Sequence, residues 1–414
     1  MKLLRIIAVY SRYAQQFYAA RPGLAEQSYS LQKRILDQDH FGVGNSLSHG
    51  LEPLGYEVTE VYPTLEPLQA AWRREHGLKD GSAEDCVMAQ AKEFQPEVIY
   101  FEFYDAALLQ RIRSEVPSVR LVLGCEGSAL SAGRAWRHLD CILSCAPESV
   151  ERLRSLGVRS ELLSHAFDGE IPNCLGPTQD PIIASFIGSI VRRNHFHIER
   201  ERVLLELVKR LPVQIFSPTL GARWQDYVKV AAAGSAYLGM GALKAARLSE
   251  YAKRHSQLVQ TAERLASVPR LPVNATLAKH MRPGVYGLKF YQTIHDSTIS
   301  INIHADSSPK YASNMRLFEA TGVGSCLLTD WKPNLDSLFE TDYEVVSYRS
   351  PEEAVEKALW LLEHTEERNE IARRGQARTL TNYTFVRQAE RLDEIICNNL
   401  GIGTGAGTQR RVAS

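Results

Sequence analysis

An arginine and a glutamate three positions apart, Arg316 and Glu319, form the most informative charged pair in the sequence. On a helix, residues at this spacing share one face. The guanidinium offers a rigid fork of donors that suits phosphate oxygens, and the carboxylate can accept hydrogen bonds from two ribose hydroxyls. The pair could therefore bind a nucleoside diphosphate. The alternative is a surface salt bridge worth under ~1 kcal/mol.

The residues around this pair predict the elements that position it. Residues 314–322 have the apolar spacing of a short helix, which Gly322 and Gly324 would end, and 325–328 and 298–303 are apolar like buried parallel strands. In an open α/β sheet, ligands bind outside the carboxyl ends of the strands. We therefore expect His304, in the loop after one strand, and Asn314, at the helix start, to form one wall of the site.

Further donor-binding candidates lie elsewhere in the second half of the chain. Gly188 and Ser189 follow a predicted strand at 182–187, where the backbone could approach a phosphate. Arg192 and Lys289 are additional cations, for which solvated surface charge is the alternative. Cations gathered in one site would stabilise a leaving nucleoside diphosphate. We recognise no clear Asp-x-Asp metal motif, and the sequence therefore predicts metal independence.

The order of strand and helix patterns predicts an α/β chain with two domains. We expect a first doubly wound domain at 1–168, a linker rich in proline and glycine at 169–181, and a second domain at 182–384. The alanine- and leucine-rich stretch of about 221–282 predicts a helical insertion in the second domain. A closing helix at 385–400 and a glycine-rich disordered tail at 401–414 complete the prediction.

The central segment resembles the donor-site signature of CgeB-like glycosyltransferases. The resemblance lies in Asn-x-Arg-x-Phe-Glu-Ala-x-x-x-Gly at 314–324 and in the strand ending Thr-Asp at 330. Residues 165–168, 183–189, 286–291 and 300–303 are also similar to that family, so that the resemblance covers most of 1–395. It implies a GT-B fold, with two Rossmann-like domains facing across a cleft, and a last helix that packs back on the first domain.

The same resemblance implies a nucleotide-sugar donor, a carbohydrate or glycoconjugate acceptor, and no organic cofactor. One position departs from the wider retaining group, whose paired glutamates have seven residues between them. The first of these positions is Tyr311 here, which puts a retaining mechanism in doubt. An inverting enzyme needs a general base near the acceptor hydroxyl. Our candidates are Glu126, after a predicted strand, and His40 and Asp39, before a glycine loop; for Glu126 the alternative is a helix cap or loop carboxylate.

The composition of the chain limits the kinds of partner and the cellular compartment that we expect. Lysine plus arginine equals aspartate plus glutamate at 48 each, which argues against a nucleic-acid binder. The seven cysteines have no disulfide-like spacing, and no apolar run reaches the ~18–20 residues of a membrane span. We therefore expect a cytoplasmic protein. Basic residues of the insertion, such as Lys244 and Arg247, leave peripheral membrane contact open, and the insertion could also make a homodimer contact.

The sequence thus predicts a glycosyltransferase of polysaccharide biosynthesis, which moves a sugar from a nucleoside-diphosphate sugar to a glycan, glycolipid or glycoprotein. Two alternatives stay open. A catalytically inactive, sugar-nucleotide-binding scaffold would bind the donor without turnover. A sugar-nucleotide epimerase would need a fuller set of acidic and histidine groups around the sugar.

Overall fold

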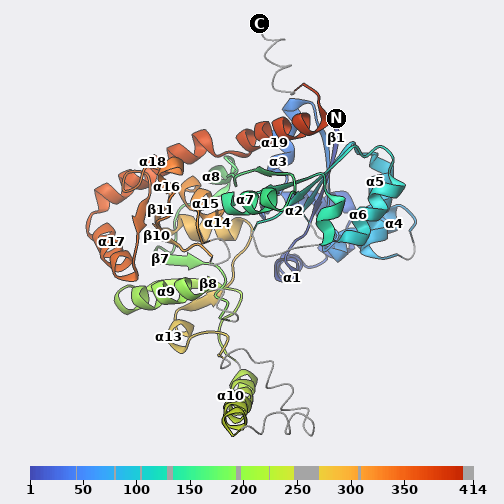
Figure 1. The fold of residues 1–414 in the computed structure, drawn as a ribbon. Coiled ribbons are helices and arrows are strands. Elements are labelled where there is room, and N and C mark those ends of the chain that lie inside the picture. The colour runs from blue at the N-terminus through green and yellow to red at the C-terminus, as the bar shows by residue number, and fades with distance from the viewer. Residues whose placement is uncertain are drawn as a thin grey trace.

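The computed structural model describes residues 1–42, 44–78, 81–102, 105–127, 134–192, 197–222, 224–246, 270–305 and 309–403. Most of the predicted tail and residues 247–269 of the predicted insertion lie outside these ranges. Two parallel six-stranded sheets organise the molecule, one from each half of the chain, with helices on both faces of each (Figure 1). The predicted α/β fold with two Rossmann-like halves is confirmed.

The first sheet has the strand order β2-β1-β3-β4-β5-β6. Its strands are β1 Lys2–Ile7, β2 Glu57–Val61, β3 Val98–Glu102, β4 Leu121–Cys125, β5 Cys141–Ser144 and β6 Ser160–Leu162. Its helices are α1 Ser11–Ala19, α2 Tyr29–Asp37, α3 Ser46–Leu51, α4 Glu66–Glu75, α5 Ala83–Phe94, α6 Ala106–Glu115 and α7 Pro147–Ser155. Short 3-10 helices span Leu24–Glu26, Glu52–Leu54 and Arg134–His138.

The second sheet has the order β12-β11-β10-β7-β8-β9. Its strands are β7 Ile182–Ile187, β8 Val213–Ser217, β9 Met281–Pro283, β10 Ser297–Asn302, β11 Cys326–Asp330 and β12 Val346–Tyr348. The helices of this half are α8 Ile171–Cys174, α9 Ile198–Arg210, α10 Trp224–Ala245, α13 Ala275–Ala278, α14 Leu288–His295, α15 Arg316–Gly322, α16 Leu335–Leu338, α17 Pro351–Glu363, α18 Thr365–Asn382 and α19 Phe385–Leu400.

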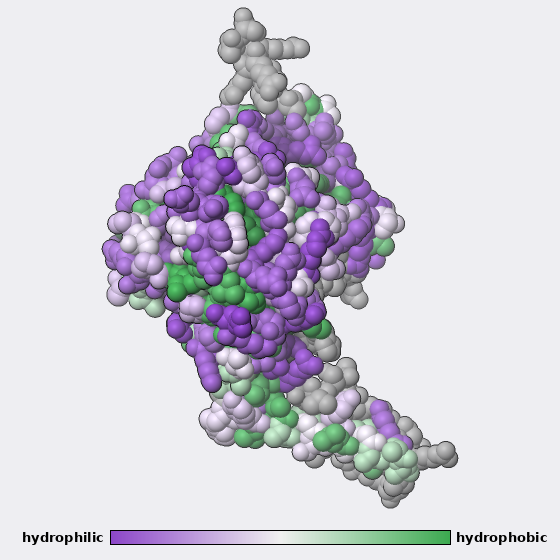
Figure 2. Space-filling model, turned by 90° about the vertical axis from the view of Figure 1, so that its left-hand side faces the viewer, coloured by the Kyte–Doolittle hydropathy of each residue, from purple (hydrophilic) through white to green (hydrophobic). Residues whose placement is uncertain are grey.

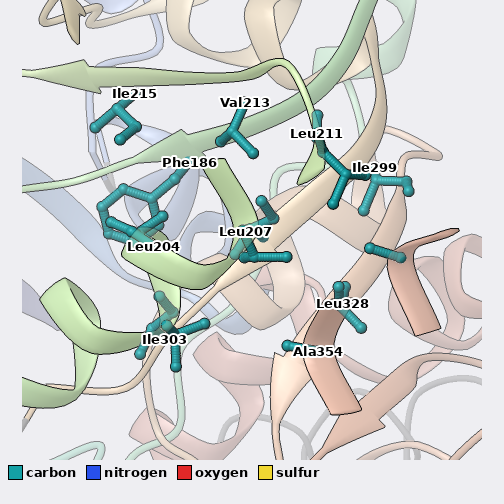
Figure 3. Packing of buried hydrophobic residues seen from close by; sticks show 14 of the residues in the cluster. Phe186, Leu204, Leu207, Leu211, Val213, Ile215, Ile299, Ile303, Leu328 and Ala354 are labelled. Carbon is teal, nitrogen blue, oxygen red and sulfur yellow. The ribbon is translucent and has the colours of Figure 1, made fainter. Parts of the chain in front are cut away.

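Each face of the second sheet has its own apolar core. Under α9 and α17, side chains such as Phe186, Leu207 and Ile299 interdigitate with none or almost none of their surface exposed (Figure 3). On the opposite face, α14 and α15 contribute Tyr291 and Phe318 to a second core. Strands buried on both faces read as continuous apolar runs, which is why the sequence identified them.

The last helix returns to the first domain. Helix α19 packs on α3, and its apolar side joins the core above β1, β3 and β4. Gly50 of α3 permits this approach, because a Cβ there would stand 2.8 Å from the carbonyl oxygen of Phe385. The backbones of Phe167 and Thr384 pair side by side where the chain crosses between the halves. Two crossing segments therefore tie the domains together.

The predicted insertion extends too far at its carboxyl end. Val273, Leu277 and Met281 are buried in the core under α9, and Met281 begins a strand of the second sheet. Residues 273–283 therefore belong to the body of the domain. The three-residue strand β9 carries too few apolar residues to give a periodic signal, whereas α10 is a helix as predicted.

Gly322 is required by packing and not by its backbone conformation. The predicted helix end depended on left-handed glycines, yet only Gly324 of the two has a positive φ, at 81°. A Cβ at residue 322 would stand 2.5 Å from the ring of Phe167. The crossing segment therefore lies directly against α15, the helix that carries Arg316 and Glu319.

Candidate functional site

Arg316 and Glu319 form a buried ion pair, with 2.9 Å between Nη1 and Oε2. Their side chains are 15% and 9% exposed, so the surface salt bridge considered as the alternative is wrong. The second guanidinium nitrogen donates to the carbonyl oxygen of Ile187 at 3.0 Å, and the guanidinium lies 4.3 Å from the ring centre of Phe290. Three independent contacts thus fix the arginine at the carboxyl end of β7.

Burial sets the electrostatics of this pair. It raises the pKa of the Glu319 carboxyl, and it lowers the pKa of the Arg316 guanidinium, while each partner opposes the effect on the other. Charges that have little water around them interact strongly with any further charge that enters. An anion beside Arg316 would therefore gain more here than at an exposed arginine.

The turn after β7 lies beside the pair, but its groups differ in availability. The N–H of Gly188 donates to the carbonyl oxygen of Phe216 at 3.0 Å, so it already has a partner in the sheet. Ser189 is exposed, and its carbonyl oxygen accepts a bond from Arg200 at 3.0 Å. The exposed hydroxyl of Ser189, and not the Gly188 amide, is the group of this turn that could meet a phosphate.

The two additional cations, Arg192 and Lys289, differ in whether they already have a carboxylate partner. Arg192 is paired with Glu201 at 2.7 Å and donates to the carbonyl oxygen of Leu271 at 2.9 Å. Both contacts tie it to the α9 side of the domain, so its prediction as a free phosphate ligand is not supported by this arrangement. Lys289 is exposed on α14, next to Phe290, and within the described part of the chain its ammonium makes no ion pair.

Asn314 and His304 hold the neighbouring loop. The amides of Asn314 and Asn302 bond to each other at 2.5 and 3.3 Å, which joins the start of α15 to β10. His304, 4% exposed, meets Asp330 at 2.7 Å through Nδ1. Burial alone would raise the pKa of Asp330, but His304 and Lys332 hold it below its ordinary value. Both residues therefore order the carboxyl ends of β10 and β11.

Asp39 is engaged on three sides. It pairs with Arg21 at 2.8 Å and accepts from the hydroxyl of Tyr13 at 3.0 Å. It also lies against Gly287 of the second domain. Burial raises the pKa of its carboxyl. These contacts describe a structural carboxylate between the domains, where the sequence predicted a general base.

Three aromatic side chains lie near the contact between Asp39 and Gly287. Tyr13 and Phe41 stack with 3.6 Å between ring centres, and Tyr286 of the second domain lies 6.1 Å from each. The sequence gives no sign of this contact, because residues 13 and 286 are brought together only by the tertiary structure.

His40 lies at the hinge. Its Nδ1 is 3.1 Å from Asp168, which also accepts from the hydroxyl of Ser46 at 2.7 Å. Burial would raise the pKa of Asp168, but His40, a backbone amide and Ser46 hold it low. His40 lines a cavity of about 900 Å³ between α2, α3 and the start of α19, whose lining residues do not include Arg316 or Glu319.

Glu126 follows β4, at the carboxyl edge of the first sheet where a base was expected. It is 8% exposed, and its backbone N–H donates to Leu143 at 2.8 Å. The other two predicted bases, Asp39 and His40, are held in the contacts described above. The next residues along the chain, 128–133, lie outside the described ranges.

The sequence does contain one Asp-x-Asp spacing, at Asp37-Gln38-Asp39. Asp37 pairs with Lys33 at 2.5 Å, and Asp39 pairs with Arg21. Each carboxylate thus already has a cation as partner.

The chain was compared with protein families and with curated proteins. Residues 200–394 match the family described as "Glycosyl transferase-like". A search of curated proteins found no match. The family match covers α15 and its ion pair, and it supports a glycosyltransferase, the class of enzyme that the sequence predicted.

Solved structures share the fold over nearly the whole chain. A glycosyltransferase from Rickettsia africae is 8% identical with a TM-score of 0.52, over 96% of this chain and 98% of that chain. A sucrose-phosphate synthase from Thermosynechococcus elongatus is 10% identical with a TM-score of 0.50, over 97% and 100%. An α-glucosyltransferase in complex with UDP-glucose and DNA containing an abasic site is 11% identical with a TM-score of 0.53, over 93% and 96%. The fold is therefore GT-B.

Proposed function

We propose that this GT-B glycosyltransferase moves a sugar from a nucleoside-diphosphate sugar to a glycan, glycolipid or glycoprotein acceptor. The observation that carries the proposal is the buried Arg316–Glu319 pair at the carboxyl end of β7. Strands β7 and β10 are neighbours at the point where the strand order reverses, which is where ligands bind in doubly wound sheets. The motif at 314–330 also leads us to propose a CgeB-like enzyme.

In this proposal Arg316 and Glu319 bind different parts of the nucleotide. Arg316 meets the diphosphate, since its position beside Ile187 points the guanidinium at the turn that contains Ser189. Glu319 uses one oxygen to orient Arg316 and offers the other to the ribose hydroxyls. Lys289 adds a movable cation. Asn314 and His304 keep the surrounding loops in place.

We propose an inverting reaction in which Glu126 takes the proton of the acceptor hydroxyl. The carboxyl edge of the first sheet is where an acceptor would face the donor, and Glu126 lies at that edge. We further propose that the leaving diphosphate is stabilised by Arg316 and Lys289, without a metal ion. The seven cysteines are free thiols, and this supports our proposal of a cytoplasmic enzyme.

Calorimetric titration of nucleoside diphosphates tests the proposal. UDP, GDP and dTDP are compared, with magnesium and with EDTA, followed by their sugar conjugates. We expect one of the nucleoside diphosphates to bind, with the same affinity in the presence of magnesium and of EDTA. Glu319→Ala should weaken the nucleoside part of binding, and Arg316→Ala should weaken the diphosphate far more than the nucleoside. UDP is first because the α-glucosyltransferase of the same fold was solved with UDP-glucose.

A matched control is available in the exposed pair of Glu370 and Arg373, which has the same spacing on α18. Arg373→Ala should leave nucleotide binding unchanged. If no diphosphate binds the unaltered chain, or if Arg316→Ala and Arg373→Ala behave alike, the donor site is elsewhere. Binding that depends on Glu319 but is followed by no sugar transfer or hydrolysis would identify a scaffold.

A further inference from the structure

The imidazole ring of His304 has one nitrogen with a partner and one without. Nδ1 and the backbone N–H of His304 both meet Oδ1 of Asp330, at 2.7 and 2.9 Å. Nε2 makes no hydrogen bond within the described part of the chain, although His304 is only 4% exposed. A buried polar atom without a partner is costly and uncommon in folded proteins. Nε2 therefore points to a group that binds beside it.

Asp330 determines which kind of group Nε2 can bind. It also pairs with Lys332 at 3.2 Å and is ionised near neutral pH. An ionised carboxylate only accepts hydrogen bonds, so Nδ1 must carry the proton that it shares with Asp330. In the neutral ring, Nε2 then offers a lone pair and needs a donor, such as a hydroxyl group.

His304 lines a cavity of about 380 Å³ at the carboxyl edge of the second sheet. The walls are residues that follow β10, β11 and β12, together with part of α9 and the first residue of α17. Ligands of doubly wound sheets bind at this edge. Ligand cavities span about 300–1,000 Å³, so this one has room for a ligand the size of a single sugar ring.

The charged side chains around the cavity suit a neutral polar ligand. Glu199 and Asp330 are balanced by Lys332 and Arg349. An anion would approach the carboxylates and a cation the basic groups, whereas hydroxyl groups can both donate and accept. Figure 2 faces the side of the molecule on which α9 and α17 lie, and the surface of the body is mostly hydrophilic there. No helix among the described residues is long and apolar enough to span a membrane.

One arginine joins this cavity to the turn beside Arg316. Arg200 donates through Nη1 to the carbonyl oxygen of Ser189 and through Nε to that of Ile303, each at 3.0 Å. Ile303 lines the cavity and immediately precedes His304. Both carbonyl oxygens thus lie within the span of one guanidinium. The cavity is therefore next to the turn that, in the proposed function, meets the diphosphate.

We infer that this cavity receives the sugar of the donor, and that Nε2 of His304 accepts a hydrogen bond from one of the sugar hydroxyls. The inference rests on the proposed function, because a diphosphate at Arg316 is what brings a sugar to this place. In a nucleotide sugar the sugar is bonded directly to the diphosphate, so the two occupy adjacent positions. Asp330 is a positioning residue, which orients the ring. A sugar without the matching hydroxyl would leave Nε2 unpaired and bind more weakly.

Two amide substitutions separate a ligand contact from a structural role. His304→Asn keeps an N–H near the place of Nδ1, where it can donate to Asp330, and removes Nε2. His304→Gln puts its amide further out, near the place of Nε2, and gives up the donor to Asp330. A purely structural histidine would tolerate Asn better than Gln in every measurement. We expect instead that His304→Asn keeps the melting temperature and loses sugar recognition.

Calorimetric titration measures that recognition. The ligands are UDP, GDP and dTDP, and the conjugates UDP-glucose, GDP-mannose and dTDP-glucose. His304→Asn should bind the diphosphate like the unaltered chain and bind its conjugate about 2- to 10-fold more weakly, the effect of one neutral hydrogen bond. His295→Asn is the control, because the Nδ1 of His295 also has a partner, the carbonyl oxygen of Val323 at 3.1 Å, at the far end of α14. It should change neither affinity.

The outcomes distinguish this inference from the proposed function. If no diphosphate binds the unaltered chain, the proposed function fails and the inference fails with it. If a diphosphate binds but none of the conjugates does, or if His304→Asn keeps full affinity for the conjugate, the inference alone is overturned. An ordered water would then be the partner of Nε2. An equal loss of affinity for diphosphate and conjugate would also overturn it, because the role of His304 would then be structural.

Discussion

Asp39 of the first domain lies directly against Gly287 of the second, so closely that a Cβ on residue 287 would stand 2.2 Å from Oδ2 of Asp39. Gly287 has a φ of 60°, in the left-handed region, and it immediately precedes α14. The residue that permits the two domains to touch is thus next to the helix that carries Lys289 and Phe290. The domain contact and the proposed donor site therefore share one element, α14.

Gly287→Ala should therefore disturb the domain contact as well as the backbone. The added methyl group must displace Asp39, which Arg21 and Tyr13 hold in place. We expect a lower melting temperature and weaker nucleotide binding. Gly157→Ala is the control, because Gly157 also has a positive φ, 75°, but nothing lies within 4 Å of its added Cβ. An equal loss in both variants would show that backbone strain alone is responsible.

Glu126→Gln should remove turnover and keep donor binding. Loss of a general base typically costs 10²–10⁴-fold in rate, and Gln keeps the size of the side chain but cannot take a proton. The measurement is the rate of sugar transfer or of donor hydrolysis, alongside a calorimetric titration of the donor. Glu115→Gln, an exposed carboxylate paired with Lys92, serves as the control. Undiminished turnover in Glu126→Gln would return the role of base to the remaining candidates.

Arg5 should prove essential for the stability of the first domain. Its side chain is fully buried in β1, where it meets Glu60 at 2.6 Å and Glu102 at 3.0 Å. Arg5→Ala would leave Glu102 without this cation and Glu60 with Lys33 alone, and removal of one partner of a buried ion pair costs about 3–5 kcal/mol. Lys2→Ala on the same strand removes a partly exposed pair with Glu57 and a hydrogen bond to the carbonyl oxygen of Phe94, which together should cost under ~2 kcal/mol. Chemical denaturation measures both; similar losses would contradict the argument.

His197 should make the protein less stable in mild acid. Burial, and then the neighbouring Arg200, lower its pKa to about 4, and its Nδ1 accepts the N–H of Val191 at 2.9 Å. Between about pH 6.5 and pH 4 the unfolded chain binds a proton that the folded chain refuses. The free energy of unfolding therefore falls as the pH falls, by up to ~1.4 kcal/mol per pH unit.

Denaturation at several pH values measures this slope, and His197→Gln tests its origin. Glutamine keeps an acceptor oxygen but does not titrate, so the variant should lose less stability between pH 6.5 and pH 4 than the unaltered chain. The same pH dependence in both chains would assign the slope to other groups, such as His165, whose pKa is also lowered to about 4 by burial.

The sequence alone determined those elements of the fold that have a local signal, which excludes β9. Strand β7 begins and ends where predicted, because it is a short apolar run with a buried middle. Helix α17 begins with a similarly local signal: the Ser350 hydroxyl accepts from the N–H of Glu353 at 3.1 Å. Such signals are local, so one stretch of chain contains all the information. The helix that carries Arg316 and Glu319 was found for the same reason.

The tertiary structure decided which of the charged residues are available. The sequence could not show that Arg192 is paired with Glu201, that Asp39 lies between Arg21 and Gly287, or that His40 faces the hinge. These partners come from other elements, and in the case of Gly287 and Asp168 from far along the chain. A charge pattern gives the kind of chemistry that a residue can perform, whereas burial and distant partners decide whether it is free to perform it.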